Sequence, residues 1–136
     1  MSRIVLDCNV FVSALLSPRG SPAQILDQWA DGDFDLVVSP LLLAELETVL
    51  SRPKFHASID RVHIDALLTG LIEDAVLVGD PPLRPGLTPD PGDDYLVALA
   101  READAQCIVS GDVHLTQLVD PSPPVLTPRE FVQSRK

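Results

Sequence analysis

Acidic residues recur in this chain where one expected element of secondary structure gives way to the next. The positions that could do chemistry together are Asp7, Glu45, Asp93 with Asp94, and Asp112. Asp7 directly follows a short apolar run, and Asp112 follows another by three residues. The carboxyl ends of parallel strands form the crevice in which ligands bind. We therefore expect these carboxylates to converge at one edge of a sheet.

Carboxylates that converge repel one another, and burial raises their pKa values unless a cation neutralises them. Hard oxygen ligands without histidine or cysteine favour Mg²⁺ or Mn²⁺ over Zn²⁺. Mg²⁺ prefers phosphate oxygens, so a phosphodiester is the natural substrate class. In a two-metal site, one ion activates water and the other stabilises the leaving oxygen. A single aspartate at a helix N-terminus is most often only a cap, so this prediction rests on the whole set.

Strand and helix signals alternate along the chain and must position these acids. Strands are expected near residues 4–6, 34–38, 75–78, 106–109 and 124–126. Helices are expected over residues 10–16, 23–30, 41–51, 60–74, 95–103 and 113–119, and after Thr127. Ser21, Ser39 and Thr127, each followed by proline, are predicted N-caps. The pattern predicts one α/β domain over residues 1–136, with three α/β/α layers around a parallel sheet of four to five strands.

Several local features carry weaker expectations. Helical spacing predicts that Trp29 is a core residue and that helix 60–74 buries Val62 and Ile72 among its apolar positions. Glu45 is expected to project among apolar neighbours toward the crevice of Asp7. Residues 79–92 form an expected loop with five prolines. Two interpretations of this loop stay open, a rigid spacer and a segment beside the site.

Composition bounds the class of protein. Apolar residues make up 46% of the chain, which excludes a disordered protein. No apolar run approaches the ~20 residues of a membrane span, and no signal peptide is evident, so we expect a cytoplasmic protein. Cys8 and Cys107 lie in or beside apolar runs and are expected to be buried thiols. The net charge of -10 argues against binding nucleic acid through a bulk positive field, but not through bound metal.

Five short motifs in order resemble the PIN-domain ribonucleases, in particular the VapC-like toxin components of bacterial toxin–antitoxin pairs. They are residues 6–10 (LDCNV) with Ser13, Ser39-Pro40 leading to Glu45-Leu46, residues 93–100 (DDYLVALA), residues 110–112 (SGD) and residues 126–131 (LTPREF). The resemblance extends over essentially the whole chain. It implies a metal-dependent endoribonuclease that uses Mg²⁺ or Mn²⁺, cleaves RNA, pairs with a cognate antitoxin protein and forms a homodimer.

The resemblance also assigns residues. It implies an acidic quartet of Asp7, Glu45, Asp94 and Asp112 as catalytic residues and metal ligands. Supporting polar groups would be Asn9, Ser13, Asp93 and Ser110. His114 stands where a further aspartate is common in the family, and Ser110 stands where threonine is commoner. Basic residues that could follow an RNA path are Arg19, Arg52, Lys54 and Arg61.

Other classes fit the sequence less well. A haloacid-dehalogenase-type phosphohydrolase needs an aspartate where Asn9 stands. A receiver domain needs a lysine directly after the fifth strand, where this chain has Thr127. Nucleases of the flap-endonuclease type carry long insertions absent from this chain. The alternatives that stay open are another PIN-fold nuclease and a non-catalytic PIN module that binds a protein partner.

Overall fold

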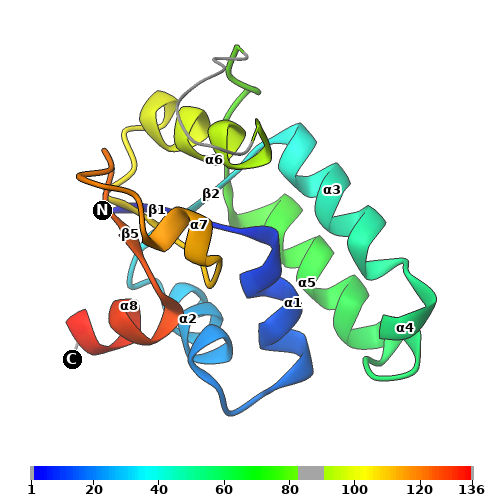
Figure 1. Cartoon of the computed structure of the whole chain (residues 1–136). Coiled ribbons are helices and arrows are strands. Elements are labelled where there is room, and N and C mark those ends of the chain that lie inside the picture. The colour runs from blue at the N-terminus through cyan, green and yellow to red at the C-terminus, as the bar shows by residue number, and fades with distance from the viewer. Residues whose placement is uncertain (1, 83–90, 136) are drawn as a thin grey trace.

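A parallel five-stranded sheet lies at the centre of the protein, seen here in a computed structural model that describes residues 2–82 and 91–135 (Figure 1). The strands are β1 (Arg3–Leu6), β2 (Asp35–Val38), β3 (Val76–Leu77), β4 (Cys107–Val109) and β5 (Val125–Leu126). Their order is β3-β2-β1-β4-β5, and each neighbouring pair is parallel. This confirms the predicted sheet. The strands with Asp7 and Asp112 at their ends, β1 and β4, are adjacent.

Central strands are apolar because helices cover both faces of the sheet. Ile4, Val5 and Leu6 are completely buried in β1. Helix α6 packs on β1 and β4, and α8 packs on β5 and on α2 (Figure 1). The layers therefore follow the predicted α/β arrangement.

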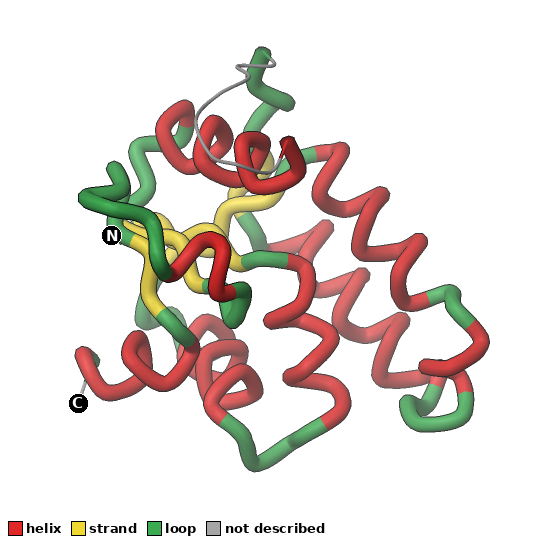
Figure 2. Tube along the Cα trace, viewed as in Figure 1, coloured by secondary structure: helices red, strands yellow, loops and turns green. Residues whose placement is uncertain are grey.

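Eight helices connect or flank the strands in the described part of the chain (Figure 2). They are α1 (Cys8–Leu16), α2 (Ser21–Ala30), α3 (Pro40–Leu50), α4 (Pro53–His56), α5 (Arg61–Asp74), α6 (Pro91–Glu102), α7 (Val113–Thr116) and α8 (Pro128–Ser134). Ser39 caps α3 by accepting a hydrogen bond from the amide of Leu42. Thr127 and Glu130 form a reciprocal capping box at α8. These two caps confirm the sequence prediction.

Some predicted boundaries were wrong. Gly20, not Ser21, is the N-cap of α2, and it supplies no side-chain hydrogen bond. Helix α4 occupies residues where only a helix stop was expected, because Pro53 at its first position is compatible with a helical start. Helix α6 begins at Pro91, four residues before the predicted start, for the same reason. Helix α7 ends at Thr116, three residues early. Residues 83–90 of the proline-rich loop lie outside the described residues.

The apolar stripe of α5 is narrower than predicted. Ile64 and Leu71 are buried on one face, seven residues apart. Val62 and Ile72 point elsewhere on the helix and are 74% and 72% exposed. The helical repeat therefore directs the side chains of Val62 and Ile72 away from the core. Trp29 is half-buried at the edge of the core, whereas both cysteines are buried free thiols, as expected.

In the described residues, no helix is both long enough and apolar enough to cross a membrane.

Candidate acidic site

Asp7 stands at the junction of β1 and α1. Its backbone amide donates to the carbonyl of Val109 in β4 at 3.0 Å, which extends the β1–β4 pairing by one residue. Its carboxylate is the N-cap of α1 and accepts from the amide of Asn9 at 3.5 Å. Asp7 therefore has a fixed backbone and a half-buried side chain at the carboxyl end of the central strand.

A buried hydroxyl joins Asp7 to the end of β4. Ser110 is completely buried, and its Oγ donates to Oδ2 of Asp7 at 2.9 Å. The same Oγ accepts from the amide of Asp112 at 3.0 Å. The Ser110 hydroxyl therefore acts both as a donor and as an acceptor. Ser110 thus holds the first and the last acid of the predicted quartet in one hydrogen-bonded chain.

Asp112 begins α7 as its N-cap. Its Oδ1 accepts from the amide of His114 at 2.9 Å, and the residue is half-buried. Since carboxylates have up to four acceptor positions, one such bond leaves oxygen lone pairs for a further ligand.

The electrostatics at Asp7 favour a cation. Burial raises the pKa of Asp7, and the charge of Asp112 raises it further, while hydrogen bonds from Ser110 and Asn9 lower it. No cationic side chain is among the causes of this shift. A carboxylate that is desolvated beside a second carboxylate is stabilised in its ionised form by a bound metal ion.

Glu45 reaches the same neighbourhood from α3. Burial raises the pKa of the Cys8 thiol to about 12, and the charges of Glu45 and Asp7 add to this shift. Cys8 lies beside α3, where its Sγ is 3.9 Å from the carbonyl oxygen of Leu42. Glu45 itself is exposed, so the expectation that it projects among apolar neighbours was wrong. The Cys8 thiol is therefore within electrostatic range of both Glu45 and Asp7.

Asp94 lies in the first turn of α6, which packs on β1 and β4. It is only 7% exposed. Asp93 and Asp94 directly precede the helix predicted over residues 95–103, where either would be its N-cap. Because α6 begins at Pro91, both lie within it instead. The side chain of Asp93 lies outside the described residues.

The predicted quartet is only partly assembled. Across residues 2–82 and 91–135, no three carboxylates, histidines or cysteines are grouped closely enough to hold a metal ion as they stand. Asn9 and Ser13 are exposed on α1, and the contact of Asn9 with Asp7 is through its backbone. The structure therefore joins Asp7 to Asp112 and places Glu45 within electrostatic range of Cys8.

Sequence reasoning missed a second polar network beside the site. The hydroxyls of Ser39 and Tyr95 are hydrogen-bonded to each other, and Tyr95 donates to Oδ1 of Asp80 at 2.7 Å. Asp80 also accepts from the amide of Leu41 at 3.1 Å. One signal was available: Tyr95 carries the single polar side-chain atom in the apolar run that follows Asp94.

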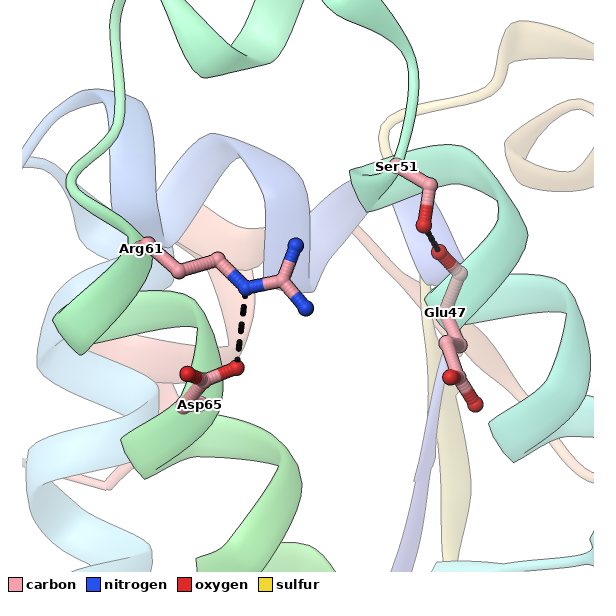
Figure 3. A network of polar contacts seen from close by, with 4 residues as sticks. All are labelled: Glu47, Ser51, Arg61 and Asp65. Carbon is pink, nitrogen blue, oxygen red and sulfur yellow. Dashed lines mark hydrogen bonds and ion pairs between the residues drawn. The ribbon is translucent and has the colours of Figure 1, made fainter.

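The basic residues proposed for RNA contact lie at the other end of the helices. Helices α1 and α3 begin after strand ends, and Arg19 follows α1 while Arg52 and Lys54 follow α3. The 11 residues of α3 span about 16 Å. Arg61 begins α5 and forms an ion pair with Asp65 at 3.2 Å, next to the C-terminal end of α3 (Figure 3). All four side chains are exposed.

A family model described as "PIN domain" matches residues 3–114, which include the acidic positions Asp7, Glu45, Asp94 and Asp112. The chain belongs to the PIN-domain family. The matched residues contain β1 to β4 and most of the helices. The PIN domain therefore accounts for the strands that carry Asp7 and Asp112.

Known proteins resemble this PIN domain over nearly its full length. An uncharacterized protein of Methanocaldococcus jannaschii, MJ1680, is 29% identical over 141 residues, covering 96% of this chain and 90% of its own. The solved structure of PAE2754 from Pyrobaculum aerophilum superposes with a TM-score of 0.67 at 16% identity, over 98% of this chain and 88% of that one.

A further solved structure, VapBC2 from Rickettsia felis bound to a DNA fragment from its promoter, superposes with a TM-score of 0.65 at 18% identity. The match covers 92% of this chain and 98% of that chain. At these identities, both superpositions establish the shared fold.

Proposed function

We propose that this PIN-domain protein is a metal-dependent endoribonuclease and the toxin of a toxin–antitoxin pair. The observation that carries the proposal is the hydrogen-bonded chain from Asp7 through Ser110 to Asp112, at the ends of two adjacent parallel strands. Membership of the PIN family supports a nuclease, and the oxygen-only acids support a hard divalent ion.

The residues present fit Mg²⁺ or Mn²⁺. Asp7, Glu45, Asp94 and Asp112 would hold the ion. Burial is the main cause of the raised pKa of Asp7, the charge of Asp112 adds to it, and no cationic side chain is among the causes. When bound, such an ion lowers the pKa of water and neutralises charge on a phosphoryl group. Ser110 orients Asp7 so that Oδ2 is held while other lone pairs stay open.

The elements that carry the acids indicate how the site would be completed. Asp7 and Asp112 are tied by Ser110, whereas Glu45 is an exposed residue on α3. A long glutamate side chain changes rotamer at small cost. Asp7 and Asp112 would therefore bind the ion first, and Glu45 would close the site or orient the attacking water. Asn9, Ser13 and Asp93 remain proposed supporting groups.

The proposed partners follow from the same family. The solved Rickettsia felis neighbour is a VapBC2 assembly with promoter DNA, which supports an antitoxin protein as partner of this chain. We propose RNA as substrate, a homodimer as the free form, and the cytoplasm as the site of action. Co-expression with a small protein encoded next to this one would be expected to yield an inactive complex.

The deciding experiment is cleavage of a panel of structured RNAs with Mg²⁺, with Mn²⁺ and with EDTA. Asp7→Asn is expected to lose at least ~100-fold in rate, since it removes a charged ligand of the proposed ion. Asp35→Asn is the matched control. It makes the same chemical change in a half-buried aspartate at the N-terminal end of β2. Asp7, by contrast, follows the C-terminal end of β1.

Cleavage that requires metal, survives in Asp35→Asn and disappears in Asp7→Asn would support the ribonuclease. Cleavage unaffected by EDTA and by Asp7→Asn would indicate a contaminating nuclease. A DNA substrate cleaved in preference to RNA would instead support another PIN-fold nuclease.

One observation favours a second candidate, a non-catalytic PIN module that binds a protein partner. In the described residues, no three potential metal ligands lie close enough together to hold an ion. Under this alternative, calorimetry would detect no Mn²⁺ binding, and no RNA would be cleaved. The partner would still be captured, and Asp7→Asn would leave that capture unchanged.

A further inference from the structure

Three polar residues from three separate segments meet at the start of α3. Ser39 follows β2 as the N-cap of α3, Asp80 follows β3, and Tyr95 lies in the first turns of α6. We call Ser39, Asp80 and Tyr95 the tyrosine clasp. It joins residues 15 to 56 positions apart in the sequence by side-chain hydrogen bonds alone.

The groups at the two ends of the tyrosine clasp, the Asp80 carboxylate and the Leu42 amide, determine which group donates in each hydrogen bond. The carboxylate of Asp80 can only accept, so Tyr95 donates to it. Ser39 therefore donates to Tyr95, and its Oγ in turn accepts from the amide of Leu42 at 3.2 Å. Asp80 accepts in addition from the amide of Leu41. The clasp thus satisfies two free amides of the first turn of α3 and binds α6 to that turn.

This arrangement is anchored in the core. Ser39 is completely buried and Tyr95 is 9% exposed, while Asp80 is exposed at the surface. A buried hydroxyl that loses its partner is costly, which gives the chain of bonds one preferred geometry. Ordinary packing of α6 would not require it, because the neighbouring Leu96 and Leu99 already pack in the core.

The tyrosine clasp connects the two helices that carry the remaining acids of the proposed site. Tyr95 adjoins Asp94 in α6, and Ser39 caps the helix that carries Glu45. Mg²⁺ demands oxygen ligands at about 2.0–2.1 Å in near-octahedral geometry. A displacement of α6 relative to α3 of about 1 Å would therefore weaken metal binding.

We infer that Tyr95, held between Ser39 and Asp80, is a positioning residue that fixes Asp94 on α6 relative to Glu45 on α3. The inference rests on the proposed metal-dependent function. Tyr95 touches neither the ion nor the RNA. It acts through the backbone of its neighbour, Asp94.

The test compares four variants in Mn²⁺ titrations, monitored both by calorimetry and by RNA cleavage. Tyr95→Phe and Asp80→Ala should each raise the Mn²⁺ midpoint by about 10-fold, the lower end of the range for groups that orient metal ligands. Asp80→Asn keeps an acceptor oxygen for Tyr95 and Leu41, so it should stay within about twofold of the wild type.

Thr127→Ala is the matched control. It removes a hydroxyl cap from α8, which packs on β5 and α2, away from the tyrosine clasp. It should lower the melting temperature without moving the Mn²⁺ midpoint. A purely structural role of Tyr95 predicts instead that Tyr95→Phe and Thr127→Ala behave alike.

Unchanged Mn²⁺ midpoints in Tyr95→Phe, or equal losses in Asp80→Asn and Asp80→Ala, would overturn the inference while the ribonuclease stands. A wild-type protein that binds Mn²⁺ without cleaving RNA would overturn the ribonuclease alone, and the calorimetric arm would still decide the role of Tyr95. A wild type that neither binds Mn²⁺ nor cleaves RNA would overturn both.

Discussion

At the scale of the residue, the ionised carboxylate of Asp7 lies in an unfavourable environment. A bound cation would stabilise this ionised form. Its pKa is raised by burial and by Asp112, against the hydrogen bonds of Ser110 and Asn9. Functional sites commonly hold such destabilised groups, and their removal commonly stabilises the fold.

The first prediction at this scale concerns pH. Because the folded pKa of Asp7 lies above its unfolded value of 3.8, the folded protein binds the proton more tightly. Asp7 therefore costs stability above its folded pKa, and this cost disappears as the pH falls through that pKa toward 3.8. Asp7→Asn should raise the unfolding free energy of the metal-free protein at pH 7 by about 1 kcal/mol.

Urea denaturation of both proteins from pH 7 downward would measure this effect. The gain from Asp7→Asn should shrink as the pH falls through the folded pKa of Asp7 and should vanish below the unfolded pKa of 3.8. Added Mn²⁺ should stabilise the wild type and not the variant. A variant less stable than the wild type at every pH would show that the hydrogen bonds of Asp7 outweigh its desolvation.

At the scale of the element, helix starts determine where the site residues lie. Asp7, Ser39 and Asp112 each cap a helix that follows a strand, and the cap bonds fix their backbone. The capping box of α8 uses the same local chemistry away from the acids. Its hydrogen bonds join Thr127 and Glu130 at 2.9 and 3.1 Å.

Helix α8 therefore provides a prediction that is independent of function. Thr127→Ala should cost about 1 kcal/mol of unfolding free energy, the usual effect of removing a threonine cap. Glu130→Ala in the Thr127→Ala background should cost less than it does alone, because the box is reciprocal. Additive losses in a double-mutant cycle would contradict that coupling. RNA cleavage should be unchanged in all three proteins.

At the scale of the whole molecule, an acidic chain carries a group of exposed cations at one end of α3. The chain carries a net charge of -10, while Arg52 and Lys54 are exposed beyond the C-terminal end of α3. Arg52 lies beyond the C-terminal end of α3, roughly 16 Å along the helix axis from the start of α3 and roughly 10 Å from Glu45. An RNA must therefore extend past Glu45 toward this end of α3 to contact these cations.

The prediction at this scale depends on RNA length. Arg52→Gln with Lys54→Gln should raise KM about threefold to tenfold for a long structured RNA, because two phosphate contacts are lost. It should leave KM unchanged for a short oligonucleotide that covers only the acidic site. Arg129→Gln, on the surface of α8, is the control cation. An equal effect on both RNA lengths would exclude the distal contact.

Much of the fold was predictable because periodicity and capping act locally. The fully buried run of β1, the cap at Ser39 and the box at Thr127 were all read from neighbouring residues. The errors have equally local causes. Proline at a first helical position extended α6 back to Pro91, and the apolar residues Val62 and Ile72 exceed what one face of α5 can bury.

The sequence by itself determined the α/β class, the parallel sheet, and that Asp7 and Ser110 lie at strand ends, since these depend on short-range patterns. Only the tertiary structure decided that Ser110 joins Asp7 to Asp112, that Glu45 is exposed beside Cys8, and that Tyr95 binds Ser39 and Asp80. Those contacts join residues 15 to 103 positions apart. Which residues meet in these contacts depends on the order of the strands and on the packing of the helices. No local sequence pattern specifies either.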